Sequence, residues 1–160
     1  MKRTSIALSI LAAGCAAAVQ VPDHLNPGAQ ESLALVVPAK GVQIYECRAD
    51  QWVFVAPQAD LFDPSGTKKI GTHYAGPHWE AADGSKVVAV VKERADAPAA
   101  GNIPWLLLSA KSVGGEGSFS KVTSIQRVAT TGGVAPKGGC NRPGAQARVG
   151  YTADYYFFTK

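Results

Sequence analysis

One short segment, HYAGPHWEAADGS at residues 73–85, concentrates the side chains with the clearest chemical potential. It holds two imidazoles, His73 and His78, and two carboxylates, Glu80 and Asp83. Groups of these types can form an acid/base pair or bind zinc. We single out His73 as a candidate general base, with Glu80 or Asp83 orienting its ring.

The same segment also has a purely structural interpretation, which depends on the elements that carry it. Gly76-Pro77 interrupts an extended run between the two histidines, and Asp83-Gly84 is typical of a tight turn. Side chains of an extended segment alternate between two faces. We therefore weigh the catalytic hypothesis against a bent β-hairpin in which Tyr74 and Trp79 pack, and we favour the hairpin.

Strand-length runs rich in Val, Ile, Thr and aromatic residues recur along most of the chain, separated by glycine, proline and aspartate. The runs lie at residues 33–37, 42–47, 52–55, 70–74, 86–92, 105–109, 121–130 and 148–158. Short strands at this spacing predict one all-β domain over residues 33–160, an antiparallel sandwich or barrel with little helix. The last run carries aromatic residues on both faces, so we expect it to be buried on both sides. Asp154 would then need a partner, and Arg127 is a candidate.

Residues 1–18 have the three parts of a secretory signal peptide: a basic start, an apolar run and small residues. The apolar run is too short to cross a membrane as a helix, which needs about 20 residues. Cleavage after Ala18 would release the protein, whereas lipidation of Cys15, in the lipobox-like residues 11–15, would anchor it to a membrane. Residues 19–32 predict an extended leader. We expect the protein in the periplasm, on the outer membrane as a lipoprotein, or outside the cell.

Cys47 and Cys140 are the two thiols that remain after either processing route. In an exported and oxidising compartment we expect them to form one disulfide. A catalytic thiol at either position is the competing hypothesis.

The charge pattern and the glycine-rich segments argue against several functions. The formal net charge is +4, which includes Lys2 and Arg3 of the predicted signal, and the basic residues are scattered. This distribution gives no basis for binding nucleic acid or an anionic lipid surface. Residues 66–71 have the two glycines of a phosphate-binding loop, but Thr72 and His73 stand where Lys and Ser/Thr are required. We expect no nucleotide, no resident metal and no other cofactor.

Aromatic side chains supply a second set of candidate binding residues. An indole offers a wide apolar face and a single donor, which suits stacking on a sugar or another small molecule. The candidate ligand-binding residues are Trp52, Tyr74, Trp79 and Arg127. Trp105 precedes three leucines, a context typical of a buried strand.

Several motifs resemble, in order, those of an exported family catalogued as domain of unknown function 3455. They are QIYECR at 43–48, HYAGPHWEAADGS at 73–85, IPWLLL at 103–108, TSIQRV at 123–128, GGC at 138–140 and YTADYY at 151–156. The resemblance implies a secreted protein from a bacterium or fungus and no established activity. The family commonly has a hydroxyl residue at the place of His78, which weakens a two-histidine metal site. Cys47 and Cys140 both lie in matching motifs, which suits a family disulfide.

Two classes of function follow. The first, which we favour, is a non-catalytic envelope or extracellular module whose loops bind a small molecule, a glycan or another envelope component. The second is a small cofactor-free secreted hydrolase, lyase or isomerase that uses His73 with Glu80 or Asp83. The second class requires these three side chains to converge.

Overall fold

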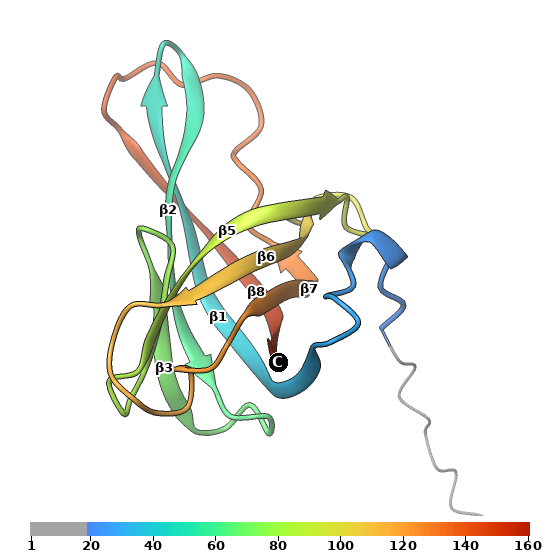
Figure 1. The fold of residues 1–160 in the computed structure, drawn as a ribbon. Coiled ribbons are helices and arrows are strands. Elements are labelled where there is room, and N and C mark those ends of the chain that lie inside the picture. Colours follow the sequence, from blue (N-terminus) through green and yellow to red (C-terminus); the bar gives the residue numbers. More distant parts are fainter. Residues whose placement is uncertain (1–18) are drawn as a thin grey trace, which may run out of the picture.

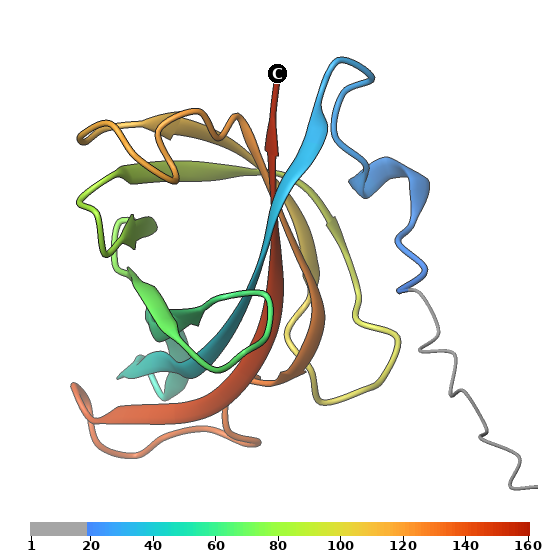
Figure 2. The same cartoon turned by 90° about the horizontal axis from the view of Figure 1, so that it is seen from below.

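The chain folds into a ring of eight antiparallel strands, each paired with its neighbours in sequence and the last paired with the first (Figures 1 and 2). The computed structural model describes residues 19–160, so the predicted signal peptide and the predicted lipidation of Cys15 lie outside the described residues. The elements are η1 (Asp23–Leu25, a 3-10 turn), β1 (Ser32–Arg48), β2 (Gln51–Phe62), β3 (Lys69–Tyr74), β4 (His78–Ala81), β5 (Lys86–Ala95), β6 (Trp105–Ser112), β7 (Ser124–Gly132) and β8 (Gln146–Thr159). No helix in this part of the chain is long and apolar enough to cross a membrane.

The predicted all-β class is confirmed, and the sheet closes as a barrel instead of stacking as a sandwich. The runs at 33–37 and 42–47 form one strand, β1, which continues through Gly41. A Cβ on Gly41 would lie 2.1 Å from the carbonyl oxygen of Gln58, so glycine is what allows β1 and β2 to stay paired here. The glycine that suggested a break therefore marks a close approach of two strands.

Two tight turns shape the segment at residues 73–85. β3 and β4 form a hairpin that turns at residues 75–77, and Gly84, with a φ of +87°, helps to turn the chain from β4 into β5. Trp79 is buried inside the barrel. The bent hairpin predicted for this segment is therefore present.

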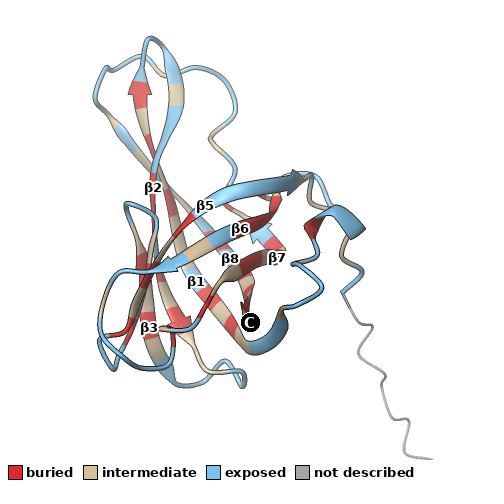
Figure 3. Ribbon diagram, viewed as in Figure 1, coloured by how far each residue is buried: buried red, intermediate tan, exposed pale blue. Residues whose placement is uncertain are grey.

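Buried and more exposed residues alternate along the strands (Figure 3), and the buried ones form the core inside the barrel. On β8 the buried inward positions are Tyr151, Ala153, Tyr155 and Phe157. Asp154 lies between them and faces outward, whereas Arg127 lies opposite Tyr155 in the register and shares the inner face. The expected pair of Asp154 and Arg127 is therefore wrong, because the two side chains lie on opposite faces of the sheet.

The segment predicted as an extended leader is docked on the outside of the barrel. Leu25 of η1 is fully buried in a small outer cluster with Trp105, Leu107 and Val128. The side-chain amide of Gln126 donates a hydrogen bond to the carbonyl oxygen of Leu25 at 2.6 Å. These contacts fix the segment against β6 and β7.

The barrel is fully paired only at one end, because β3 and β4 are short. β2 pairs with β3 through residues 59–62, and β5 pairs with β4 through residues 86–88. Residues 51–58 of β2 and 89–95 of β5 pair on one side with β1 and β6. Within residues 19–160 no strand pairs with their other edges, which face each other, and the two strands diverge in Figure 1. We call the region between the two edges the side opening. Exposed apolar residues of these edges are Val53, Phe54, Val55, Val90 and Val91.

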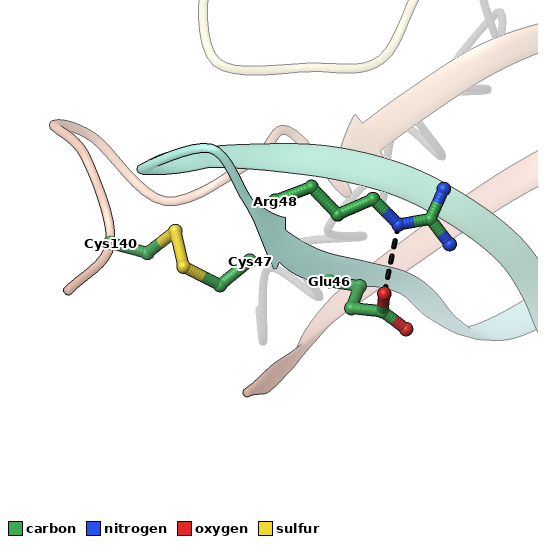
Figure 4. The surroundings of a disulfide bond; sticks show 4 residues. All are labelled: Glu46, Cys47, Arg48 and Cys140. Carbon is green, nitrogen blue, oxygen red and sulfur yellow. Dashed lines mark hydrogen bonds and ion pairs between the residues drawn. A yellow bond between two sulfur atoms is a disulfide. The ribbon is translucent and has the colours of Figure 1, made fainter. Parts of the chain in front are cut away.

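The predicted disulfide is confirmed and joins the β1–β2 hairpin to the loop between β7 and β8 (Figure 4). Cys47 and Cys140 are 93 residues apart in sequence and 5.7 Å apart at Cα. The backbone N–H of Cys140 also donates to the carbonyl of Asp50 at 3.0 Å. The loop is thus tied to the hairpin covalently and by a backbone hydrogen bond.

Replacing both cysteines by serine should lower the free energy of unfolding by about 2 to 5 kcal/mol, because the crosslink closes a long loop in the unfolded chain. Urea denaturation followed by tryptophan fluorescence measures the change. The reduced wild-type protein is the matched control and should unfold at the same urea concentration as the variant. An unchanged midpoint in the double variant would contradict a stabilising role for this crosslink.

Candidate functional site

A cavity of about 120 Å³ lies inside the barrel beside the side opening. We call it the barrel cavity. Its lining residues are Gln43, Phe54, Pro57, His73, Pro77, Trp79, Val91, Leu106, Leu108, Arg127 and Tyr155. Phe54 and Val91 are half-exposed members of the two unpaired edges, and Pro77 belongs to the β3–β4 turn. The cavity therefore reaches solvent where the barrel lacks strand pairing.

His73 is held inside the barrel by aromatic contacts. Its ring stacks on Trp79 with the centroids 4.0 Å apart and the planes 16° from parallel. Tyr155 approaches edge-on, with a centroid distance of 5.3 Å. Only 3% of His73 is exposed. The ring therefore has little freedom to turn.

A hydrogen bond fixes the tautomer of His73. Its Nδ1 lies 2.8 Å from the carbonyl oxygen of His78, and a carbonyl can only accept, so Nδ1 carries the proton. Burial lowers the pKa of His73 to about 3, the hydrogen bond to His78 opposes this, and the charge of Arg127 adds to the lowering. His73 is therefore neutral at neutral pH, and its Nε2 is an acceptor.

Arg127 brings a positive charge to the cavity lining. Its Nε and Nη2 donate to the carbonyl oxygen of Pro104 at 3.1 and 2.9 Å. Among residues 19–160 no carboxylate lies within ion-pair distance of this guanidinium. The charge on the cavity wall is thus balanced by no acidic side chain of the described chain.

Gln43 and Trp79 add two buried donors. Gln43 is 2% exposed and Trp79 is 1% exposed. In the described part of the chain, neither Gln43 Nε2 nor Trp79 Nε1 has a hydrogen-bond partner. An unpaired buried donor costs about 1 to 3 kcal/mol, which makes such atoms noteworthy in a cavity wall.

Glu80 and Asp83 lie away from the cavity, so the structure does not assemble the proposed set with His73. Strand alternation places Glu80 on the outer face, where its carboxylate accepts a hydrogen bond from Tyr74 and pairs with Lys86 at 3.1 Å. The Tyr74 hydrogen bond and the Lys86 contact lower the pKa of Glu80. Both interactions stabilise the outside of the sheet.

Asp83 has a structural role at a loop junction. Its carboxylate accepts hydrogen bonds from the backbone and hydroxyl of Ser118 at 2.8 and 2.6 Å. It accepts a second such pair from Ser85 at 2.9 and 2.6 Å. The hydrogen bonds from Ser118, then those from Ser85, hold the pKa of Asp83 well below its usual range. Asp83 therefore ties the β4–β5 turn to the loop between β6 and β7.

The candidate ligand-binding residues divide into two groups. Trp79 and Arg127 line the barrel cavity together with His73. Tyr74 lies on the outer face, stacked on His78 at a centroid distance of 5.1 Å. Trp52 lies beside the disulfide, opposite Cys47 in the β1–β2 register. The structure thus brings together only part of the predicted set.

Sequence reasoning did not select Gln43, Leu106 or Leu108. Gln43 lies on the same buried face of β1 as Tyr45 and Cys47, so a polar residue at an inward position was the available signal. The two leucines were interpreted as ordinary core residues. Across residues 19–160, no three side chains of His, Cys, Asp and Glu converge as a metal site would require.

Residues 27–159 match the family described as "Protein of unknown function (DUF3455)", and the chain belongs to this family. The match includes every strand and the entire lining of the barrel cavity. The family resemblance inferred from the motifs is therefore confirmed. No curated protein and no solved structure matches the chain.

The buried, neutral His73 should make stability sensitive to acid. In the folded protein the pKa of His73 is about 3, below the ordinary value of 6.5 that applies in the unfolded chain. Between these two pH values the unfolded chain binds a proton that the folded protein does not. The free energy of unfolding therefore falls as the pH drops from 6.5 toward 3. His73→Phe keeps an aromatic ring against Trp79 and removes this proton linkage. Between pH 7 and pH 3.5, the wild type should therefore lose about 4 kcal/mol more unfolding free energy than the variant.

Urea unfolding at a series of pH values measures this difference. His24→Phe replaces an exposed histidine in the same way and serves as the matched control. If the free energy of unfolding changed equally with pH in the wild type and in His73→Phe, a neutral, buried His73 would be contradicted.

Proposed function

We propose that this domain is a non-catalytic exported binding module, in which the barrel cavity holds a small, mainly apolar molecule. The molecule enters through the side opening. The observation that carries the proposal is an apolar cavity, with a few buried polar groups on its wall, that reaches solvent between the two unpaired edges of β2 and β5. Pockets for small molecules commonly have this character.

The size of the cavity defines the size of the ligand. Leu106, Leu108 and Trp79 supply large apolar surfaces around a volume of about 120 Å³. An apolar cavity of about 150 Å³ is known to hold one benzene ring. The barrel cavity therefore fits a body of about one ring, and any larger ligand extends into the side opening.

The arrangement of His73 favours binding over the alternative enzymatic function. A general base is commonly oriented by a carboxylate, but the Nδ1 proton of His73 is held by a backbone carbonyl. Glu80 and Asp83 form their hydrogen bonds elsewhere. A glycan or a protein partner is less well matched, because Trp52 and Tyr74 form no shared platform with the cavity lining.

Export is the part of the proposal that rests on the sequence. Residues 1–18 have the pattern of a secretory signal. A disulfide between Cys47 and Cys140 is typical of proteins in an oxidising compartment. The ligand is therefore expected outside the cytoplasm, in the cell envelope or the medium.

A bulky residue at the mouth should block the cavity. Val91 lines the cavity, whereas its neighbour Val90 does not and is 69% exposed. Fluorobenzene, followed by fluorine NMR, is the probe. We expect Val91→Trp to weaken its binding by about tenfold or more, equivalent to about 1.4 kcal/mol.

Val90→Trp is the matched control, since it adds the same side chain to the same strand on the other face. It should bind fluorobenzene as the wild type does, and both variants should unfold at the wild-type temperature. Failure of the wild type to bind the probe, or equal binding by the two variants, would overturn the proposal.

A further inference from the structure

At one end of the barrel cavity, which we call the polar end, the lining includes polar side chains. Gln43 and Arg127 line the cavity and also an adjoining shallower hollow of about 340 Å³. Arg94 and Pro104 line only the second hollow. No acidic residue of the described chain contributes to either lining. The polar end thus offers hydrogen-bond donors and positive charge.

Arg127 is the charge that a ligand inside the cavity would meet. His73 is neutral and contributes a hydrogen-bond acceptor, so it does not compete with Arg127 for an anion. Burial raises the pKa values of Tyr45, Tyr151 and Tyr155. In each case the positive charge of Arg127 opposes this rise. Among the described residues, Arg127 is therefore the one charged side chain in the lining of the barrel cavity.

Gln43 provides a second donor that lacks a partner. Its Nε2 is buried and has no hydrogen-bond partner among residues 19–160. A ligand group that only accepts hydrogen bonds would satisfy this atom and Arg127 together. Guanidinium and carboxylate groups have matching geometry, and their charge-assisted hydrogen bonds are about twice as strong as neutral ones.

We infer that the molecule bound in the barrel cavity carries a carboxylate, which accepts hydrogen bonds from Arg127 and Gln43 while its apolar body packs against Trp79. This inference rests on the proposed function. The chemistry is shared by a free ring-sized acid and by a fatty acid whose chain leaves through the side opening.

The test compares two probes of the same shape, para-fluorobenzoate and para-fluorobenzamide, by fluorine NMR titration at pH 7. The wild type should bind the charged probe about tenfold more tightly or better, since charge-assisted hydrogen bonds are the difference. Arg127→Met should bind both probes equally. Arg148→Met is the matched control, because Arg148 is exposed and contacts Gln58 outside the cavity lining, and it should retain the wild-type preference.

Fluorobenzene separates the failure of this inference from failure of the proposed function. If fluorobenzene and the benzamide bind as tightly as the benzoate, the inference of a carboxylate is overturned, and the proposal of a binding cavity stands. If no probe binds, both are overturned. Should Arg127→Met fail to fold, Gln43→Leu replaces it, and an unchanged preference in that variant counts against the inference.

Octanoate distinguishes the two sources of the carboxylate. Tighter binding of octanoate than of benzoate, with loss in Arg127→Met, assigns a fatty acid that uses the side opening. Tighter binding of benzoate, with the same loss, assigns a free ring-sized acid. Binding of either acid that is unchanged in Arg127→Met overturns the inference.

Discussion

Backbone pairing around the barrel is the constraint on which the rest of the structure depends. β1 has 17 residues and β8 has 14, but β3 has 6 and β4 has 4. At about 3.3 Å per residue, the short strands cover less than half the length of the long ones. Over part of their length, β2 and β5 are therefore paired on one side only, with β1 and β6 respectively. The barrel stays open there, with an apolar cavity behind the opening and exposed valines beside it.

Much of the fold could be predicted because its signals are local. Runs rich in Val, Ile, Thr and aromatic residues, separated by turn residues, identified most strands, and cysteine counting identified the disulfide. The continuity of β1 could not be predicted in this way, because the reason for Gly41 lies in Gln58 on another strand. The docking of Leu25 also depends on a distant partner, the outer face of β6 and β7. Closure into a barrel is likewise a property of the whole sheet.

The candidate site was predictable only in part, for the same reason. We selected His73, Trp79 and Arg127 from their residue types, and all three line the barrel cavity. Glu80 was selected with them because it is close in sequence, but alternation along the strands puts it outside the barrel. Gln43 was not selected, because a lone glutamine in a strand carries no chemical signature until its burial is known. Knowledge of the inward face would have improved the prediction more than any further motif.

A xenon-pressurised crystal would show whether the barrel holds an accessible apolar cavity at the side opening. Xenon occupies apolar cavities of this size without needing a polar contact. We expect a xenon peak between Trp79, Leu106 and Leu108, with the protein otherwise unchanged. Density showing Phe54 and Val91 closed over a filled space, with no xenon there, would contradict it.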